Sequence, residues 1–183
     1  SFEASCGRLK SDRIDLYQIH WPDPSTPLRE TMETLLELKS AGAIGEIGVC
    51  NLSPGQIEEA CSYAPVASYQ GLYNYLQREV EDEILPLCAE RKIAFLSYSS
   101  LAQGLLGGDC REGYVPTRGD VRRFNPLFND ENNLSRSLEE VSRLGKRPAR
   151  EALRFLSDTG RVSSMLVSMT KRKHLEENLS ALS

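Results

Sequence analysis

Short apolar runs alternate with amphipathic segments along the whole chain, and this alternation restricts the fold more than any other feature. Five runs predict strands, at residues 14–20, 44–50, 66–70, 93–98 and 164–167. Helical spacing of apolar residues predicts helices at 28–41, 82–91, 134–144, 148–158 and 171–182. Ser53 and Pro54 predict a further helix start, with Ser as the N-cap. Strands that alternate with helices are typical of βα units, so we predict an α/β fold with a parallel sheet in a single domain over 1–183.

Composition limits the classes of partner. The 183 residues include 22 Lys and Arg against 26 Asp and Glu, a net charge of −4 that disfavours a general binder of nucleic acid or membrane surfaces. No apolar run approaches the roughly 20 residues of a membrane span, and we expect no signal peptide. The five cysteines include no C-x-x-C pair and are typical of free thiols in a reducing cytosol. We therefore expect a cytoplasmic protein without a metal, nucleic-acid or membrane partner.

Polar or thiol groups follow the predicted strands where each strand ends, at His20, Cys50 and Asn51, Gln70, Tyr98 and Ser168. The carboxyl ends of parallel strands form the active face of α/β folds. A single polar strand end is also explained by the chain leaving the core, but five in succession favour a shared site.

His20 has two interpretations. It is either a hydrogen-bonded structural residue or a donor beside a reacting oxygen. Alternation along its strand places Leu16, Gln18 and His20 on one side and Tyr17 and Ile19 on the other.

A basic run, Lys171-Arg172-Lys173, opens the last predicted helix. Free N–H groups and the helix dipole make such a start suitable for a phosphate, although a solvated basic patch fits the same residues. Gly104 to Gly108 is not a P-loop, and no G-x-G-x-x-G is present, so a nucleotide would bind outside both schemes. The segment from 101 to 133, rich in Gly, Arg and Asn, predicts one long functional loop.

Several motifs in order resemble the aldo-keto reductases: DRIDLYQIHWPD, ETMETLLELKSAGAIGEIGVCNLS, YQGLYNYLQRE, LPLCAERKIAFLSYSSLAQGLLGG, GDVRRFNPLF and KHLEENLSALS. The resemblance runs from about Gly7 to the C-terminus. It implies a parallel (β/α)8 TIM barrel that binds NADP(H) and reduces carbonyls.

At the reacting end, His20 resembles the active-site histidine that hydrogen-bonds the substrate carbonyl, and Trp21 falls beside the substrate. Asn51 and Gln70, with Cys50 where the family usually has Ser, resemble the clamp on the nicotinamide carboxamide. Cys is a weaker hydrogen-bond partner than Ser, so this clamp is expected to be looser.

The resemblance implies further cofactor contacts along the second half of the chain. They are Tyr98 on the nicotinamide ring; Ser99, Leu101 and Gln103 at the pyrophosphate; Ser168, Lys171 and His174 around the 2′-phosphate; and Glu177 and Asn178 at the adenine. Residues 107–133 resemble a loop that covers cofactor or substrate. The basic run favours NADP over NAD.

The family's catalytic set is Asp, Tyr, Lys and His, and only the His is matched here. The motifs align the first predicted strand with the family's fourth, so we expect an incomplete barrel of about five βα units that lacks the first three. Its outer strands would be open edges suited to self-association. Besides a carbonyl reductase, the sequence leaves open an inactive NADP(H)-binding regulatory module or a truncated product, and it does not identify the substrate.

Overall fold

The computed structural model describes residues 2–108 and 110–182 and confirms a parallel α/β fold. Its strands form one sheet in the order β1-β2-β3-β4-β5. The strands are β1 (Ile14–Ile19), β2 (Ile44–Cys50), β3 (Ser68–Leu72), β4 (Ala94–Tyr98) and β5 (Ser164–Met165). The order in the sheet is therefore the order along the chain, as in consecutive βα units.

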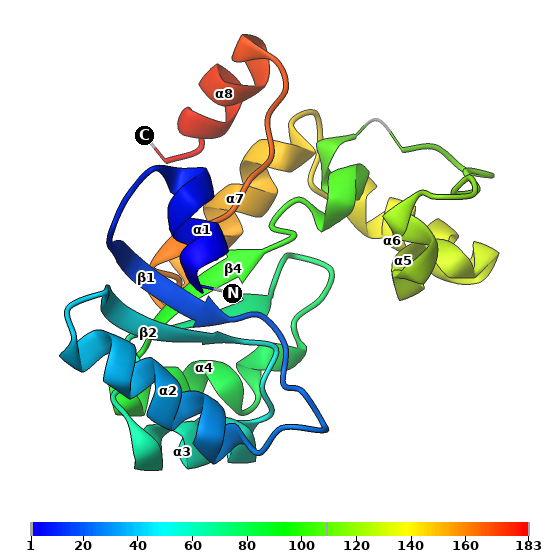
Figure 1. Ribbon diagram of the computed structural model, residues 1–183. Helices are drawn as coiled ribbons and strands as arrows, with labels where there is room; N and C mark the ends of the chain where they lie inside the picture. The colour runs from blue at the N-terminus through cyan, green and yellow to red at the C-terminus, as the bar shows by residue number, and fades with distance from the viewer. Residues whose placement is uncertain (1, 109, 183) are drawn as a thin grey trace. The chain divides into compact units, whose positions relative to one another are not determined.

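The helices alternate with these strands (Figure 1). The α-helices are α1 (Phe2–Leu9), α2 (Leu28–Ser40), α3 (Pro54–Tyr63), α4 (Ile84–Arg91), α5 (Pro126–Asn129), α6 (Glu131–Arg143), α7 (Pro148–Asp158) and α8 (Arg172–Leu179). Shorter 3-10 turns are η1 (Glu79–Glu81), η2 (Ala102–Gly107) and η3 (Val121–Phe124). The predicted start of α3 is confirmed, because Ser53 Oγ accepts from the Gln56 N–H and Gln56 Oε1 accepts from the Ser53 N–H.

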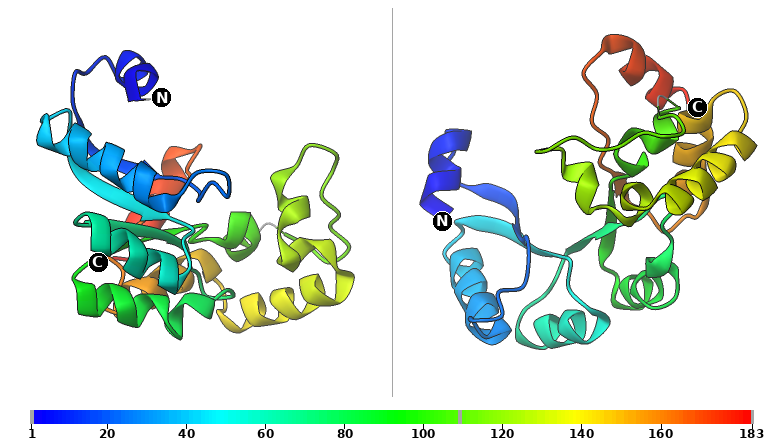
Figure 2. Two further views of the ribbon diagram at one scale, coloured as in Figure 1. Left: turned by 60° about the horizontal axis from the view of Figure 1, so that its bottom comes forward. Right: turned by 90° about the vertical axis from the view of Figure 1, so that its right-hand side faces the viewer.

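The chain forms two compact units, which are described separately. Unit 1 comprises Ser1–Gly71 and Val80–Leu96, and unit 2 comprises Leu72–Glu79 and Ser97–Ser183. In unit 1, α2, α3 and α4 lie on the same side of the strands (Figure 2). Met32, Ile47, Val49 and Ile57 have no exposed surface, so α2, α3 and β2 all contribute to this core.

The parallel register of unit 1 stacks side chains in layers. Gln18 lies opposite Gly48, and Gly48 lies opposite Ser68. Two residues further along, Cys50 lies opposite Gln70. Because side chains alternate between the faces of a strand, these layers share one face of the sheet. The predicted placement of Gln18 on the same side of its strand as His20 agrees with this register.

Unit 2 is built around a second apolar cluster. Buried residues of η2, α5, α6 and α7 pack together: Ala102, Leu105, Leu106, Phe128, Leu134, Val141 and Ala152. The prediction of one long loop over residues 101–133 is therefore wrong. Apart from residue 109, which the structure does not describe, this segment contains η2, η3, α5 and the start of α6. Side-chain caps start these short elements, since Asp120 accepts from the Arg122 N–H, Asn125 from the Leu127 N–H and Asp130 from the Asn132 N–H.

Several predicted boundaries are also corrected. β3 begins two residues later than expected, β5 is shorter, and the last helix ends at Leu179. Gln70 therefore lies inside β3, and Ser168 follows β5 after an irregular segment. Helix α1 was not predicted; it packs Phe2 edge-on against Tyr17 of β1, with ring centroids 5.8 Å apart.

We expect Gly48→Ala to destabilise the chain. A Cβ at Gly48 would lie 2.5 Å from Ser68 Oγ and 2.7 Å from Gln18 Cγ, so overpacking should lower the free energy of unfolding by about 1–3 kcal/mol. The control is Gly55→Ala in α3, where a Cβ meets nothing within 4 Å. Urea unfolding of both variants measures the difference, and equal stabilities would contradict the register described here.

Candidate active site

Asn51 joins the ends of three neighbouring strands in unit 1. Its Nδ2 donates to the backbone oxygen of His20 at 3.0 Å and contacts Cys50 Sγ at 3.1 Å. Its backbone N–H donates to the backbone oxygen of Gln70 at 3.4 Å. Asn51 adopts the left-handed conformation, with φ +59°, which Asn tolerates better than most residues. The structure thus brings His20, Cys50, Asn51 and Gln70 together at one point.

The His20 side chain is exposed and follows the last residue of β1. Among residues 2–108 and 110–182, its imidazole has no hydrogen-bond partner, so the nitrogens are available to a ligand. Its ring lies 6.2 Å from that of Trp21, which is 61% exposed. Trp21 also borders a cavity of about 290 Å³ lined by Pro22, Thr26 and Gln56, among others. His20 thus presents its ring to solvent beside the exposed Trp21.

Cys50 lies in the same layer as Gln70 and is almost completely buried. Burial raises the pKa of its thiol to about 11, because a charged thiolate would lose its hydration. The thiol is therefore neutral near pH 7. As a weak acceptor for the Asn51 amide, the sulfur helps to orient that amide rather than to react.

A second group of predicted residues surrounds one cavity in unit 2. The cavity has a volume of about 390 Å³ and is lined by Ser99, Ser100, Leu101, Gln103, Gly104, Leu166, Val167 and Ser168. Four predicted cofactor contacts, Ser99, Leu101, Gln103 and Ser168, are therefore brought together. Tyr98 precedes this group as the last residue of β4 and is half-buried.

The cavity is held by polar residues that the sequence analysis did not single out. Ser100 Oγ donates to the backbone oxygen of Leu166 at 3.2 Å. Asn74, fully buried, donates from Nδ2 to the backbone oxygen of Ser99 at 3.1 Å. Asn74 also accepts from the backbone N–H groups of Leu76 and Gln77. Its place in the motif YQGLYNYLQRE was visible in the sequence, but its supporting role required the fold.

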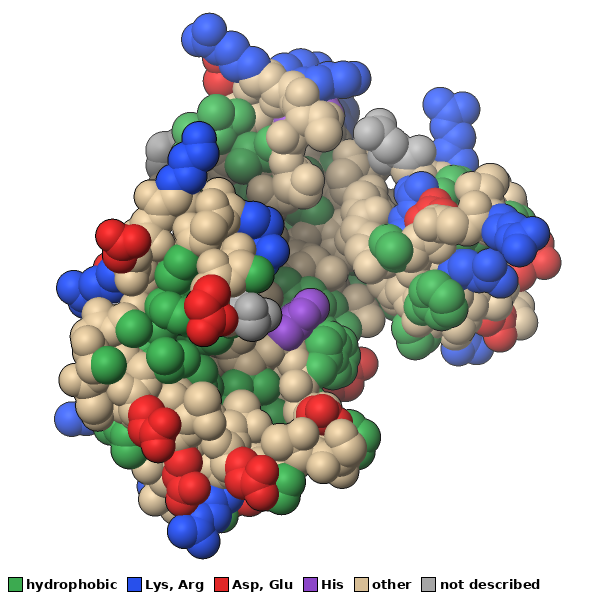
Figure 3. Space-filling view, in the orientation of Figure 1, with side chains coloured by type: hydrophobic (Ala, Val, Ile, Leu, Met, Phe, Trp, Pro, Cys, Tyr) green, Lys and Arg blue, Asp and Glu red, His purple; other side chains and the backbone are tan. Residues whose placement is uncertain are grey.

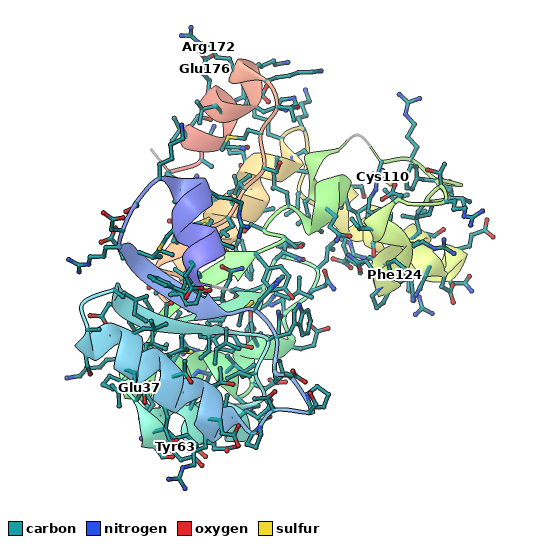
Figure 4. The ribbon with its side chains drawn as sticks, viewed as in Figure 1. Glu37, Tyr63, Cys110, Phe124, Arg172 and Glu176 are labelled. Carbon is teal, nitrogen blue, oxygen red and sulfur yellow. The ribbon has the colours of Figure 1, made fainter. Side chains whose placement is uncertain are left out.

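Ion pairs neutralise two of the three cations in the basic run at the start of α8. Arg172 Nε lies 2.8 Å from Glu176 Oε1, and Figure 4 shows the two residues on α8. Lys173 Nζ lies 3.6 Å from Glu177 Oε1. Lys171 is exposed and has no ion-pair partner in the part of the chain that the structure describes. Lys and Arg side chains gather over α8 in Figure 3, but only Lys171 of the run leaves its charge unpaired.

The remaining predicted contacts on α8, Glu177 and Asn178, line different cavities. Glu177 lines a cavity of about 340 Å³ with Lys146, Arg147 and Arg150. Asn178 instead lines a more apolar cavity of about 500 Å³ with Leu175 and Leu179, among others. His174 is half-buried, and its backbone N–H donates to the backbone oxygen of Lys171. The structure therefore does not bring Glu177 and Asn178 to one cavity.

The described residues are neither grouped as metal ligands nor shaped into a membrane-spanning helix. In residues 2–108 and 110–182, no three His, Cys, Asp or Glu side chains are grouped so that they could bind a metal ion. Within the same ranges, every helix is too short or too polar to cross a bilayer. A cytoplasmic location stays a prediction.

Comparison with known proteins supports the resemblance. An NADH-specific methylglyoxal reductase of Escherichia coli is 37% identical over 189 residues, which cover 98% of this chain and 57% of that protein. The aldo-keto reductase YhdN of Bacillus subtilis is 44% identical over 126 residues, covering 69% of this chain and 38% of its own length. The solved structure of a glycerol dehydrogenase from Gluconobacter oxydans has a TM-score of 0.81 and 28% identity, covering 99% of this chain and 62% of that one.

The matched part of the chain thus spans 57% of the length of the methylglyoxal reductase and 38% of the length of YhdN. The sequence profile of the aldo/keto reductase family matches residues 1–183. Together with the strand order and the grouped strand ends, this match shows that the chain belongs to the aldo-keto reductase family.

Proposed function

We propose that this chain is part of an NADP(H)-dependent oxidoreductase that reduces aldehyde or ketone carbonyls to alcohols by hydride transfer. The observation that carries the proposal is the cavity of about 390 Å³ in unit 2, where Ser99, Leu101, Gln103 and Ser168 meet. Hydroxyl and amide donors around this cavity suit a pyrophosphate. The residues present therefore fit a nicotinamide dinucleotide, and the chemistry that this cofactor supplies when bound is a hydride.

In unit 1, His20 would orient the carbonyl oxygen of the substrate. Its exposed imidazole is free to donate a hydrogen bond, and Asn51 fixes the backbone of His20 through its carbonyl oxygen. Cys50, Asn51 and Gln70 would hold the nicotinamide carboxamide. The proton for the product oxygen would come from the family's Tyr, assisted by Lys and Asp.

A second candidate function is a regulatory module that binds NADP(H) without turnover. The same donors around the cavity of about 390 Å³ in unit 2 support this candidate, since they suit a dinucleotide whether or not turnover follows. Both candidates need the cofactor, but only the reductase needs His20 to meet a carbonyl.

Turnover of a small aldehyde distinguishes the two candidates. We expect the chain to change the fluorescence of NADPH on binding, and the reductase candidate predicts that a barrel in which this chain is combined with the family's Tyr, Lys and Asp oxidises bound NADPH when methylglyoxal is added. His20→Ala should lower that oxidation by about a hundredfold while leaving NADPH affinity unchanged, because His20 acts on the carbonyl. Binding without oxidation would support the regulatory module, and no binding would contradict both.

We further propose NADP(H) rather than NAD(H) as the preferred cofactor. Lys171 supports this preference, since its unpaired charge at the start of α8 suits a 2′-phosphate. The Escherichia coli relative is named as NADH-specific, so the preference varies within the family.

Lys171→Ala should therefore weaken NADPH binding by about tenfold and leave NADH binding unchanged, because only NADPH carries the 2′-phosphate. Arg172→Ala is the matched control, since Arg172 is already paired with Glu176 and its loss should change either affinity less than twofold. Fluorescence titrations with both cofactors measure the ratio. Equal losses for NADPH and NADH in Lys171→Ala would contradict the assignment.

The outer strands of the sheet, β1 and β5, support a proposal of self-association. Leu16 of β1 is 36% exposed and Leu166, next to β5, is 43% exposed. We expect the chain to elute in gel filtration as a species larger than its 20.4 kDa mass, because unpaired strand edges and apolar surface pair between copies. A monomeric elution volume across the measured concentrations would contradict this expectation.

A further inference from the structure

Asn125 links the predicted pyrophosphate contact Gln103 to a segment of unit 2 that the proposed function does not use. We name residues 114–128 the strap. Asn125, at the start of α5, is 9% exposed, and its Nδ2 donates to Gln103 Oε1 at 3.1 Å. Gln103 is exposed, lines the cavity of about 390 Å³ and has a left-handed backbone with φ +53°.

The strap is held rigidly around Asn125. Tyr114 donates from its hydroxyl to Asp120 Oδ2 at 2.9 Å, and Arg122 donates to both oxygens of the same carboxylate. The Arg122 guanidinium lies 4.7 Å from the centre of the Tyr114 ring and 5.9 Å from that of Phe128. Two charge-assisted bonds from Arg122 hold the pKa of Asp120 well below its ordinary value, so this fastening persists at neutral pH.

The strap is also anchored in the core of unit 2. Phe128 is 4% exposed and packs in the apolar cluster that contains Leu105 and Leu106 of η2. Phe124, by contrast, is 81% exposed, and Figure 4 shows it on the outside of the strap. Asn125 lies between these two residues and is held by the buried Phe128 and by its own backbone N–H, which donates to the backbone oxygen of Arg122 at 3.0 Å.

The hydrogen bonds around Asn125 determine the orientation of the Gln103 amide. The backbone N–H of Leu127 donates to Asn125 Oδ1 at 3.0 Å, which identifies that atom as the oxygen. The other atom of the Asn125 amide is then a nitrogen, which can only donate, so Gln103 must accept through Oε1. Gln103 Nε2, with two N–H donors and no partner among the described residues, is left for the cavity.

We infer that Asn125 is a positioning residue, which sets Gln103 so that the amide presents its donors, not its oxygen, to the pyrophosphate of a bound dinucleotide. The inference rests on the proposed cofactor site. An amide free to rotate would present its oxygen to a phosphate for part of the time and would repel it. The chain of bonds from Leu127 through Asn125 removes that alternative before the cofactor arrives.

The test uses Asn125→Ser, which retains a good N-cap for α5 but cannot reach Gln103 in the same way. We expect its affinity for NADPH and for NADH to fall equally, by about fivefold, because both cofactors carry the pyrophosphate. Gln103→Ala should lose about tenfold, and the double variant should be no weaker than Gln103→Ala alone. Ser142→Ala is the control, since the Ser142 hydroxyl donates to the backbone oxygen of Glu139 within α6 and the variant should bind like the wild type.

A second measurement needs no cofactor. In Asn125→Ser, the side-chain amide signals of Gln103 in a nitrogen–proton NMR spectrum should shift toward those of a free glutamine amide, because the hydrogen bond to Oε1 is gone. Wild-type affinity in Asn125→Ser, or additive losses in the double variant, would overturn the inference and leave the proposed function intact. A wild-type chain that binds neither cofactor would overturn the proposed function, and the inference with it.

Discussion

The parallel register between β1, β2 and β3 is the constraint on which the candidate active site depends. Gly48 has no Cβ, so Gln18 and Ser68 can lie against it from both neighbouring strands. The next layer of the same face then consists of Cys50 and Gln70, and His20 follows directly after β1. A shift of one residue would turn all of these side chains to the helix side. The position of the catalytic candidate is thus a property of backbone pairing.

The two units use different physical means to hold their functional residues. In unit 1, a single residue, Asn51, links the strands: its side chain bonds to His20 and Cys50, and its backbone N–H to the backbone oxygen of Gln70. In unit 2, buried amides and hydroxyls of Asn74, Ser100 and Asn125 support an irregular loop with repeated left-handed residues. Irregular backbone cannot satisfy its own polar groups, so it needs such side chains.

The alternation of strands and helices could be predicted from the sequence because each regular element has its own pattern of apolar residues. β2 has the predicted bounds, and Ser53 caps α3 as expected. The elements of residues 101–133 escaped prediction because they are short and depend on tertiary packing, such as that of Phe128. The end of a strand placed His20 correctly, but Gln70 lies inside β3. The pairing of Arg172 and Lys173 with Glu176 and Glu177 required coordinates. A run of cations does not reveal which of them is neutralised.

The burial of Cys50 has a consequence for chemical durability. Aldehydes and dicarbonyls add to thiolates, so an enzyme that handles them risks modification of its own cysteines. With a pKa of about 11 and 2% exposure, Cys50 is both protonated and shielded. At pH 7 only about one molecule in ten thousand would carry the reactive thiolate. A cysteine in this layer is therefore poorly suited to attack electrophiles that reach the strand ends.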